Sequence, residues 1–538
     1  MEAYLSIPMW IAAVSPIVVL MVLMIGLSWG ATKAAPLGLG LAAVVALVLY
    51  KASPFLIACE VGKGLWSALT VLMVVWPAVL IYEVSDNVGA FAVFRVGMQK
   101  FTPNELLQVI MIGWVFVSFL MGVTGFGVPV AVGAPLLVGL GVNPLWAVMI
   151  PLMGHAWGNT FGTLAVAWDA LVLQTDLTSD PVLMLRTAMW AAIFIWIWNA
   201  ITGVAICLFY GGMPALKKGF PAIALVSLIQ GGGQLILSQI NQTLCNFVPC
   251  CFALAAVFLL GRTKLYSEPW KVENSQLMDR SKSGDNAEKG PEDMSMVQAF
   301  VPYFLLTFVT LFVLLIKPVK AFMAQISLGF AFPETQTGLG FVNAASAKYS
   351  PVTPFAHAFF FLLLSSFVGH MFFKKHGWTK AGDGMKVLKR SFERTAPSAV
   401  AVICFLVMSK IMGGTGMTDI LARGIAGALG NGYAVLAPVV GMLGAFMTSS
   451  NMASNVLFGQ FQLTTAGILG LDKALILAAQ TAGGAIGNTI CPGNIILGTT
   501  TAGNIGQEGV VLKKIMPITL FAAVLVGIIL FTKLIVLG

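Results

Sequence analysis

Charged residues are scarce in this chain. Only 9% of its 538 residues are Asp, Glu, Lys or Arg, and 58% are hydrophobic, whereas ordinary soluble domains carry roughly 25% charged residues. Apolar runs of about 20 residues, the length that a helix needs to cross a bilayer, recur from end to end; examples are residues 7–29, 184–210, 294–316 and 515–537. They do not alternate apolar and polar residues, as the strands of an outer-membrane barrel would. The composition predicts an all-α polytopic membrane protein, located in the cell membrane.

The sequence also lacks the usual signatures of enzymes and pumps. It contains no His-Glu-x-x-His, no Asp-rich diphosphate motif, no Gly-x-Ser-x-Gly and no Walker motif, which disfavours an intramembrane enzyme and an ATP-driven pump. Its seven cysteines include no Cys-x-x-Cys pair, so they are expected to be packing residues rather than metal ligands. The net charge of +9 is small for this length and lies in short loops, which gives no reason to expect nucleic acid as a partner. No cofactor is expected.

Four segments are expected along the chain. Residues 1–103 would be N-terminal scaffold spans, 104–210 a first transport repeat, 211–394 middle scaffold spans, and 395–538 a second repeat. The first apolar run follows no basic segment and precedes no cleavage site, so it is expected to be a retained span. The basic loops of the middle segment are placed in the cytoplasm, because positive loops usually stay inside. If each apolar segment between them crosses once, the two repeats are inverted relative to each other.

Polar residues interrupt an apolar run twice in each repeat. The first repeat has "TGFGVP" (124–129) and "GHAWGNTFGT" (154–163), and the second has "MTSSNMASN" (447–455) and "GGAIGNTICPGN" (483–494). Glycine and threonine also allow membrane helices to pack closely, and a shared "GNT" can arise by chance. The matched order and spacing favour a binding site, since inverted repeats with interrupted helices are the architecture of secondary transporters.

The interruptions suit a small ion. Backbone that leaves a helix within a bilayer must be buried or line a cavity, where its free N–H groups attract anions and its free carbonyls attract cations. No arginine lies in or beside any of the four interruptions. His155 is a candidate proton carrier, although a lone histidine is often a satisfied core residue. Asp169 is a second candidate, or a residue that caps its helix near the outer interface.

The segments "TGFGVPVAVGAPLLVGLG" (124–141) and "SSNMASNVLFGQFQ" (449–462) resemble the L-lactate permease family, and the resemblance extends over the whole length. That family is similar to a wider ion-transporter superfamily that includes sodium-coupled dicarboxylate carriers. The resemblance implies two re-entrant hairpins and two broken helices that together hold a carboxylate and a cation. Carried over by position, the implied site residues are Thr124, Gly125, Phe126, Gly127, Gly158, Asn159, Thr160, Ser449, Ser450, Asn451, Gly487, Asn488 and Thr489.

The resemblance implies a secondary active transporter for a small monocarboxylate such as L-lactate, with proton-coupled symport by an elevator-like movement. Sodium coupling, with backbone carbonyls of the breaks as ligands, is the alternative. A cation/proton antiporter is less favoured, because Asp and Glu are missing from both break motifs. The expected partners are a small organic anion, the lipid bilayer and a second copy of the chain, which would form a homodimer through residues 220–260. The family often carries an acidic residue at the position of Asn451 and a lysine near Asn488.

Overall fold

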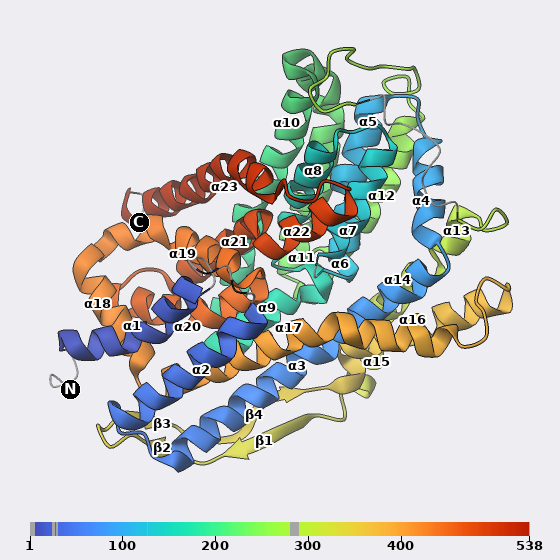
Figure 1. The fold of residues 1–538 in the computed structure, drawn as a ribbon. Helices are drawn as coiled ribbons and strands as arrows, with labels where there is room; N and C mark the ends of the chain where they lie inside the picture. The colour runs from blue at the N-terminus through green and yellow to red at the C-terminus, as the bar shows by residue number, and fades with distance from the viewer. Residues whose placement is uncertain are drawn as a thin grey trace.

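The computed structural model describes residues 6–23, 27, 29, 31–125, 127–279 and 290–536. Within these residues, ten helices are long and apolar enough to cross a membrane, and one further pair, Val301–Leu315 with Lys317–Met323, is bent by 94°. The prediction of an all-α polytopic membrane protein is therefore confirmed. Figure 1 shows the resulting bundle, in which helices α2 (Ala31–Val48), α3 (Pro54–Asn87), α16 (Ala358–Lys375) and α17 (Asp383–Gly414) lie along the lower side.

The first repeat consists of one interrupted apolar helix, a return arm and a broken helix. Its elements are α5 (Glu105–Ile110), η3 (Met111–Phe116, a π-helical stretch), α6 (Val117–Val123), α7 (Val128–Gly139), α8 (Pro144–Ala156), α9 (Gly162–Thr175) and α10 (Pro181–Ser227). Asn104 and Asn143 start α5 and α8, since their side chains accept hydrogen bonds from the backbone N–H groups of Leu107 and Leu145 and so satisfy donors that the first turn leaves free.

The second repeat follows the same plan. Its elements are α19 (Tyr433–Thr448), α20 (Asn451–Leu469), α21 (Lys473–Gly487), η10 (Asn488–Ile490), α22 (Pro492–Thr501) and α23 (Glu508–Phe531). The two repeats interlock reciprocally, because α7 packs against α22 while α9 packs against α20. The return arm of each hairpin thus contacts the short helix after the break in the other repeat, which is the arrangement that an approximate two-fold relation between the repeats would produce.

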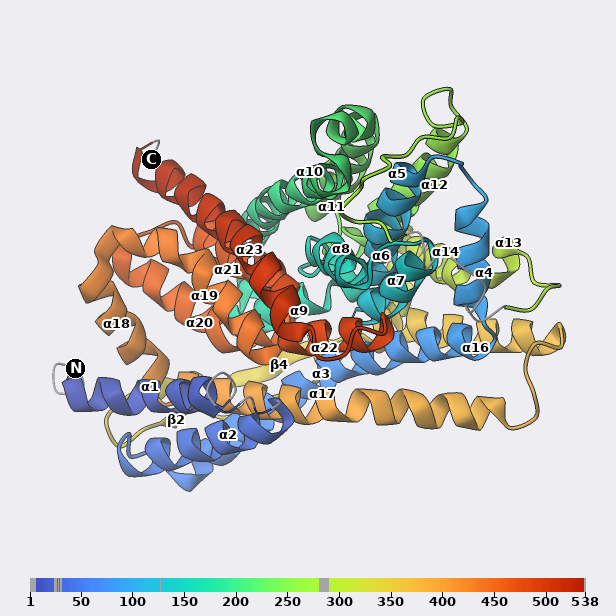
Figure 2. The ribbon, with the colours of Figure 1, turned by 45° about the horizontal axis from the view of Figure 1, so that its top comes forward.

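The remaining helices lie outside these two sets of elements, and the last two of them fall partly or wholly within residues 395–538, the predicted second repeat. They are α1 (Ile7–Met21), α2 (Ala31–Val48), α3 (Pro54–Asn87), α4 (Ala90–Gln99), α11 (Gly233–Ser238), α12 (Phe247–Gly261), α13 (Met296–Ala299), α14 (Val301–Leu315), α15 (Lys317–Met323), α16 (Ala358–Lys375), α17 (Asp383–Gly414) and α18 (Met417–Leu429). Short helical stretches lie between or after the helices at η4 (Leu177–Ser179), η5 (Leu228–Gly232), η6 (Gln242–Leu244), η8 (Pro354–Ala356), η9 (Gly430–Gly432) and η11 (Thr532–Val536), the last of which follows α23. Helix α3 packs against both α16 and α17, and the three run as long rods below the repeats in Figure 2.

The connections contain structure that the composition does not reveal. Strand β1 (Leu328–Phe332) pairs with β4 (Ser346–Val352), and between them β2 (Thr335–Gln336) pairs with β3 (Val342–Asn343). The aromatic residues of this hairpin pack on each other and on α3. The span expected at 184–210 continues as α10 to Ser227 through a kink at Gly211 and Gly212. The basic residues that follow α16 lie partly in the first turns of α17, which begins at Asp383. The division into four segments stays a prediction.

An ion pair joins α3 to α17. Arg394 Nη1 lies 2.8 Å from Oε1 of Glu83, whose side chain is 5% exposed, and the guanidinium stacks 4.6 Å above the Tyr82 ring. We expect Arg394→Met to lower the free energy of unfolding by about 2 kcal/mol, because it leaves Glu83 buried and unpaired. This loss is smaller than the ~3–5 kcal/mol expected on breaking a fully buried pair, since Arg394 is partly exposed. Thermal unfolding in detergent measures this. Arg423→Met breaks the exposed Arg423–Asp419 pair and should change stability by less than about 1 kcal/mol; equal losses in both variants would contradict the prediction.

Candidate functional site

The tip of the first hairpin lies between α6 and α7. Gly125 and Gly127 have φ of +55° and +80°, a left-handed conformation that glycine adopts without steric cost. A Cβ on Gly125 would collide with Thr163 Oγ1, and one on Gly127 would approach Leu497 Cδ2 to 2.6 Å. The first tip therefore packs against the broken helix of its own repeat and against α22 of the other repeat. Phe126, also predicted here, lies outside the described residues.

The tip of the second hairpin is shorter. Ser449 ends α19 with φ +56°, and the Ser450 side chain accepts a hydrogen bond from the Ala453 N–H, so it caps the start of α20. Asn451 is the first residue of α20. The backbone N–H of Gly493, just after the second break, donates to Ser449 Oγ at 3.2 Å. Like the first tip, the second is held against a break.

The first helix break extends over several residues between α8 and the regular part of α9. Thr163, Leu164 and Ala165 all have positive φ, between +50° and +72°. Each left-handed residue other than glycine costs roughly 1–2 kcal/mol, so the surrounding contacts must impose this path. The Asn159 side chain donates to the carbonyls of His155 and Ala156, which also accept from the backbone N–H groups of Gly158 and Asn159 in the turn that ends α8.

The second break is compact. Helix α21 ends at Gly487, a single 3-10 turn covers Asn488–Ile490, and extended Cys491 leads into Pro492 at the start of α22. A Cβ on Gly487 would come within 2.7 Å of the Met442 backbone. Glycine is therefore required here for the close approach of α21 to α19, and the break itself is made by the turn and the proline.

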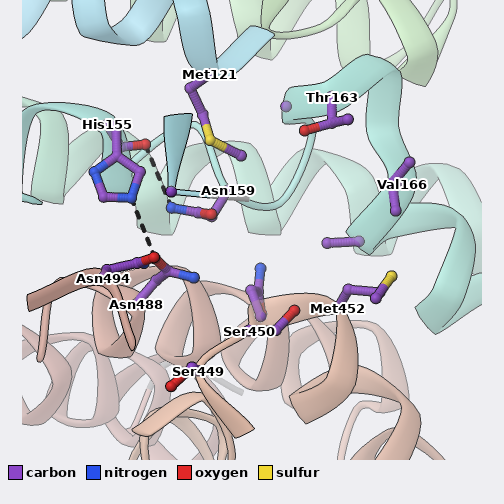
Figure 3. Close-up of a pocket in the computed structure, with 14 residues that line it drawn as sticks. Met121, His155, Asn159, Thr163, Val166, Ser449, Ser450, Met452, Asn488 and Asn494 are labelled. Atoms are coloured by element: carbon purple, nitrogen blue, oxygen red, sulfur yellow. Dashed lines mark hydrogen bonds between the residues drawn. The ribbon is translucent and has the colours of Figure 1, made fainter. Parts of the chain in front are cut away.

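A small buried cavity of about 40 Å³ lies where both tips and both breaks meet. Since one water needs roughly 10–15 Å³ by this measure, the cavity has room for about three waters. Figure 3 shows residues of the first repeat along one side and residues of the second repeat along the other. The lining residues are Met121, Gly127, His155, Asn159, Gly162, Thr163, Val166, Ala167, Ser449, Ser450, Asn451, Met452, Asn488 and Asn494.

Seven of the residues proposed from the sequence line the cavity, and others support it. The seven are Gly127, His155, Asn159, Ser449, Ser450, Asn451 and Asn488. Thr124, Gly125, Gly158, Thr160, Gly487 and Thr489 are buried beside it without appearing in its lining. Asp169 also lies outside the lining, one turn beyond Val166 on α9.

Sequence reasoning missed an asparagine and the apolar wall. Asn494 Nδ2 donates to Asn488 Oδ1 at 2.5 Å. Asn494 is the last residue of the segment "GGAIGNTICPGN", but it was not among the predicted site residues. Met121, Val166 and Met452 supply the apolar side of the cavity, and their sequence context does not differ from that of ordinary packing residues.

The cavity is polar, and His155 is the only ionisable residue in its lining as described. His155 is 1% exposed; its Nδ1 lies 2.7 Å from the Pro151 carbonyl and its Nε2 lies 3.2 Å from Asn488 Oδ1. Amides and hydroxyls supply the other polar groups. Such a lining can hold a small anion through several hydrogen bonds, without an arginine clamp.

A second polar network lies directly behind the tips. Thr160 Oγ1 is 3.2 Å from both the carbonyl and the hydroxyl of Thr481, and it accepts from Asn451 Nδ2 at 3.4 Å. Asn455 Nδ2 donates to Thr481 Oγ1 at 2.9 Å. In the part of the chain that the structure describes, Oδ1 of Asn451 and Oδ1 of Asn455 are buried without a partner. Unpaired buried oxygens are unfavourable, so these positions favour occupation by water or a ligand.

Gly484 controls the position of Asn451. A Cβ on Gly484 would strike Asn451 Oδ1, so we expect Gly484→Ala to displace that amide. If the site binds L-lactate, as the sequence resemblance implies, this variant should weaken binding about tenfold, the effect of losing one hydrogen bond of about 1.5 kcal/mol to a charged group. Titration of purified protein with L-lactate measures the affinity. Gly413→Ala, on α17, is the matched control, because its Cβ would meet nothing within 4 Å. Unchanged affinity in Gly484→Ala would show that Asn451 is not held by this contact.

An all-helical bundle whose interlocked repeats enclose a small polar cavity at two helix breaks defines a membrane transporter. Comparison with known families agrees, since the family model described as L-lactate permease matches residues 9–537. The chain therefore belongs to the L-lactate permease family, as its sequence motifs predicted, and it is a multi-pass membrane transporter rather than an enzyme.

Several curated relatives cover most of the chain. An L-lactate permease of Halalkalibacterium halodurans is 26% identical over 474 residues, with 84% of this chain and 82% of the relative covered. An L-lactate permease of Escherichia coli is 26% identical over 515 residues, with 91% and 89% covered. The glycolate permease GlcA of Escherichia coli is 26% identical over 505 residues, with 87% and 84% covered. The crystal structure of the Alcanivorax borkumensis YdaH transporter aligns with 89% of this chain and 87% of its own at 15% identity and a TM-score of 0.45.

Proposed function

We propose that the protein is a secondary active transporter that carries a small 2-hydroxy monocarboxylate, such as L-lactate or glycolate, together with a proton. The observation that carries this proposal is the cavity between the two tips and the two breaks, which is small, buried, and lined by amides, hydroxyls and one histidine. The names of the relatives, L-lactate permease and glycolate permease, support the same substrate class.

The polar and the apolar groups of the cavity suit the two ends of such a substrate. Asn488 and Ser450 offer donors for a carboxylate, and Asn159 Oδ1 can accept from a 2-hydroxyl group, since Asn159 Nδ2 already donates to two carbonyls. Met121 and Val166 offer apolar contact for a methyl group. The absence of arginine from the lining residues suits a monocarboxylate rather than a dicarboxylate, since two carboxylates would need more positive charge.

A larger cavity of about 850 Å³ adjoins the site beyond the second tip. The two cavities share Ser449, Ser450, Met452 and Asn494, so a small anion could pass from one to the other by a local movement of this tip. We infer that the two repeats then move together against the scaffold of α3, α16 and α17, which is an elevator-like mechanism. Cysteine cross-links that fix a hairpin to α17 should trap one facing state, and full transport in every cross-linked variant would count against this movement.

Sodium coupling is the second candidate, and one observation favours it. The unpaired oxygens of Asn451 and Asn455 lie behind the second tip, and hard oxygen ligands of this kind suit a hard cation. Accumulation of L-lactate in sodium-free vesicles would support the proton, and an absolute need for sodium would support this alternative. A cation/proton antiporter is less well supported, because the described lining contains no carboxylate.

Counterflow of labelled L-lactate in liposomes tests the proposed function. Vesicles that contain the purified protein and unlabelled L-lactate should take up labelled L-lactate transiently, and unlabelled glycolate should compete while a dicarboxylate should not. Protein-free vesicles measure leakage of the undissociated acid. Absence of counterflow, together with a sodium-driven pH change that needs no organic anion, would replace the proposal with the antiporter.

A further inference from the structure

Both ring nitrogens of His155 face oxygen atoms. The Pro151 carbonyl, 2.7 Å from Nδ1, can only accept a hydrogen bond, so Nδ1 carries a hydrogen whether the ring is neutral or charged. Nε2 faces Asn488 Oδ1 at 3.2 Å. An oxygen at that position can be bonded only if Nε2 also carries a hydrogen, which makes the ring an imidazolium. The arrangement of these side chains is therefore the one that suits protonated His155.

The Asn488 amide has two useful orientations. With its oxygen toward Nε2, this oxygen also accepts from Asn494 Nδ2 at 2.5 Å, and the described chain offers no acceptor to Asn488 Nδ2, so the nitrogen is left for a ligand in the cavity that Asn488 lines. If Nε2 loses its proton, its lone pair and the facing Asn488 Oδ1 repel each other. A half-turn of the Asn488 amide restores the bond with Asn488 Nδ2 as the donor, and the Asn494 amide turns with it, so that Asn494 Oδ1 accepts from Asn488 Nδ2 where Asn494 Nδ2 donated before. Asn488 would then present its oxygen to the cavity.

We propose that His155 and Asn488 form a proton-dependent switch for anion binding, an inference that rests on the proposed transport of a monocarboxylate. A proton from water binds the Nε2 lone pair, Nε2–H then holds Asn488 Oδ1, and Asn488 Nδ2 donates to the carboxylate. Release of the proton turns the amide, so that an oxygen faces the anion and repels it. Asn488 is thus the residue that contacts substrate, and His155 is a positioning residue that acts through it.

The opposite charges of the protonated His155 ring and the anion couple proton binding to anion binding. A charged ring buried in this cavity is costly unless an opposite charge is nearby, and the lining residues include no carboxylate. The anion itself supplies the missing negative charge. Proton and anion are therefore each more stable in the presence of the other, and the protein should bind them in a one-to-one ratio.

Among the described residues, no other charged group lines the cavity and competes with the anion for His155. Helix α8 packs against η3, α6, α7, α10, α21, η10, α22 and α23. The described titratable or charged groups on or directly beside these elements are Asp180, Arg186, Cys207, Tyr210, Lys217, Lys218, Asp472, Lys473, Cys491, Glu508, Lys513 and Lys514. None of them lines the cavity, and Asp169, on the wall helix α9, lies one turn beyond Val166.

Proton uptake on binding is the first test. Isothermal titration of the purified full chain with L-lactate, in buffers of different ionisation enthalpy, counts the protons taken up per bound anion. The parent should take up close to one proton at mildly alkaline pH, and its affinity should fall with rising pH by up to about tenfold per unit, the limit for one linked proton. His155→Gln should bind L-lactate without proton uptake and without this pH dependence, whereas Asp169→Asn should behave as the parent.

The second test measures the protonation state of the His155 ring. A histidine with a purely structural role would keep the same protonation state when L-lactate binds. In ¹⁵N-histidine-labelled protein, L-lactate should convert the Nε2 signal of one of the four histidines from the unprotonated to the protonated position, and His155→Gln should remove that signal. A neutral ring in the L-lactate complex, or proton uptake that survives in His155→Gln, would overturn the switch while leaving the proposed monocarboxylate transport intact. Absence of L-lactate binding in the folded parent protein would overturn both.

Discussion

Asn488→Ala is expected to lower the uptake of L-lactate at low substrate concentration by roughly 10- to 150-fold. The estimate is the loss of one hydrogen bond to a charged group, about 1.5–3 kcal/mol. Asn488 lines the cavity and contacts two other residues that line it, since its Oδ1 accepts from Asn494 Nδ2 and faces His155 Nε2. Initial rates in proteoliposomes over a range of substrate concentrations measure the effect, which should appear mainly as a raised KM.

Asn343→Ala is the matched control for this variant. Asn343 Nδ2 also makes a short hydrogen bond, 2.7 Å to the Gly414 carbonyl, but it lies on β3 and outside the cavity lining. Its replacement should reduce thermal stability somewhat and leave the KM for L-lactate unchanged. Normal substrate affinity in the double variant Asn159→Ala with Asn488→Ala would contradict binding by these amides.

His155→Gln is expected to abolish accumulation of L-lactate driven by a pH gradient, while exchange of internal for external L-lactate continues. Glutamine has a similar reach and can bond to Asn488, but it cannot carry a proton near neutral pH. The expected loss is complete, because no other ionisable group lines the described cavity. Labelled uptake into vesicles with an alkaline lumen measures accumulation, and counterflow in the same vesicles measures exchange.

Asp169→Asn separates the two proton-carrier candidates. Asp169 lies on the same helix as Val166 but outside the cavity, so its variant should still accumulate L-lactate in response to a pH gradient. If accumulation is lost in Asp169→Asn and unchanged in His155→Gln, the carrier is the carboxylate and His155 has only a packing role.

Much of the fold and part of the site could be predicted from the sequence, for a physical reason. Backbone cannot leave a helix within lipid unless it is buried or wetted, so clusters of Gly, Asn and Thr within apolar runs mark the places where helices break. The four interrupted segments were found in this way, and the family resemblance then pointed to Gly127, Ser450 and Asn451 at the tips and to Asn159 and Asn488 at the breaks. All five line the cavity.

What could not be predicted depends on contacts between distant segments. Nothing local favours left-handed backbone at Thr163, Leu164 and Ala165, because the surrounding helices impose it. Asn494 acquires its importance only because the compact second break turns it back onto Asn488. Both are consequences of tertiary packing, which a single sequence does not encode in a local pattern.

The central claim is that one proton and one monocarboxylate cross together through the site between the two repeats. The most direct test adds L-lactate outside sodium-free proteoliposomes that carry a pH-sensitive dye in the lumen, with protein-free vesicles to correct for leakage of lactic acid. The account predicts protein-dependent acidification of the lumen at the same rate as entry of labelled L-lactate. Labelled L-lactate that enters with no acidification, or that enters only when sodium is supplied, would contradict it.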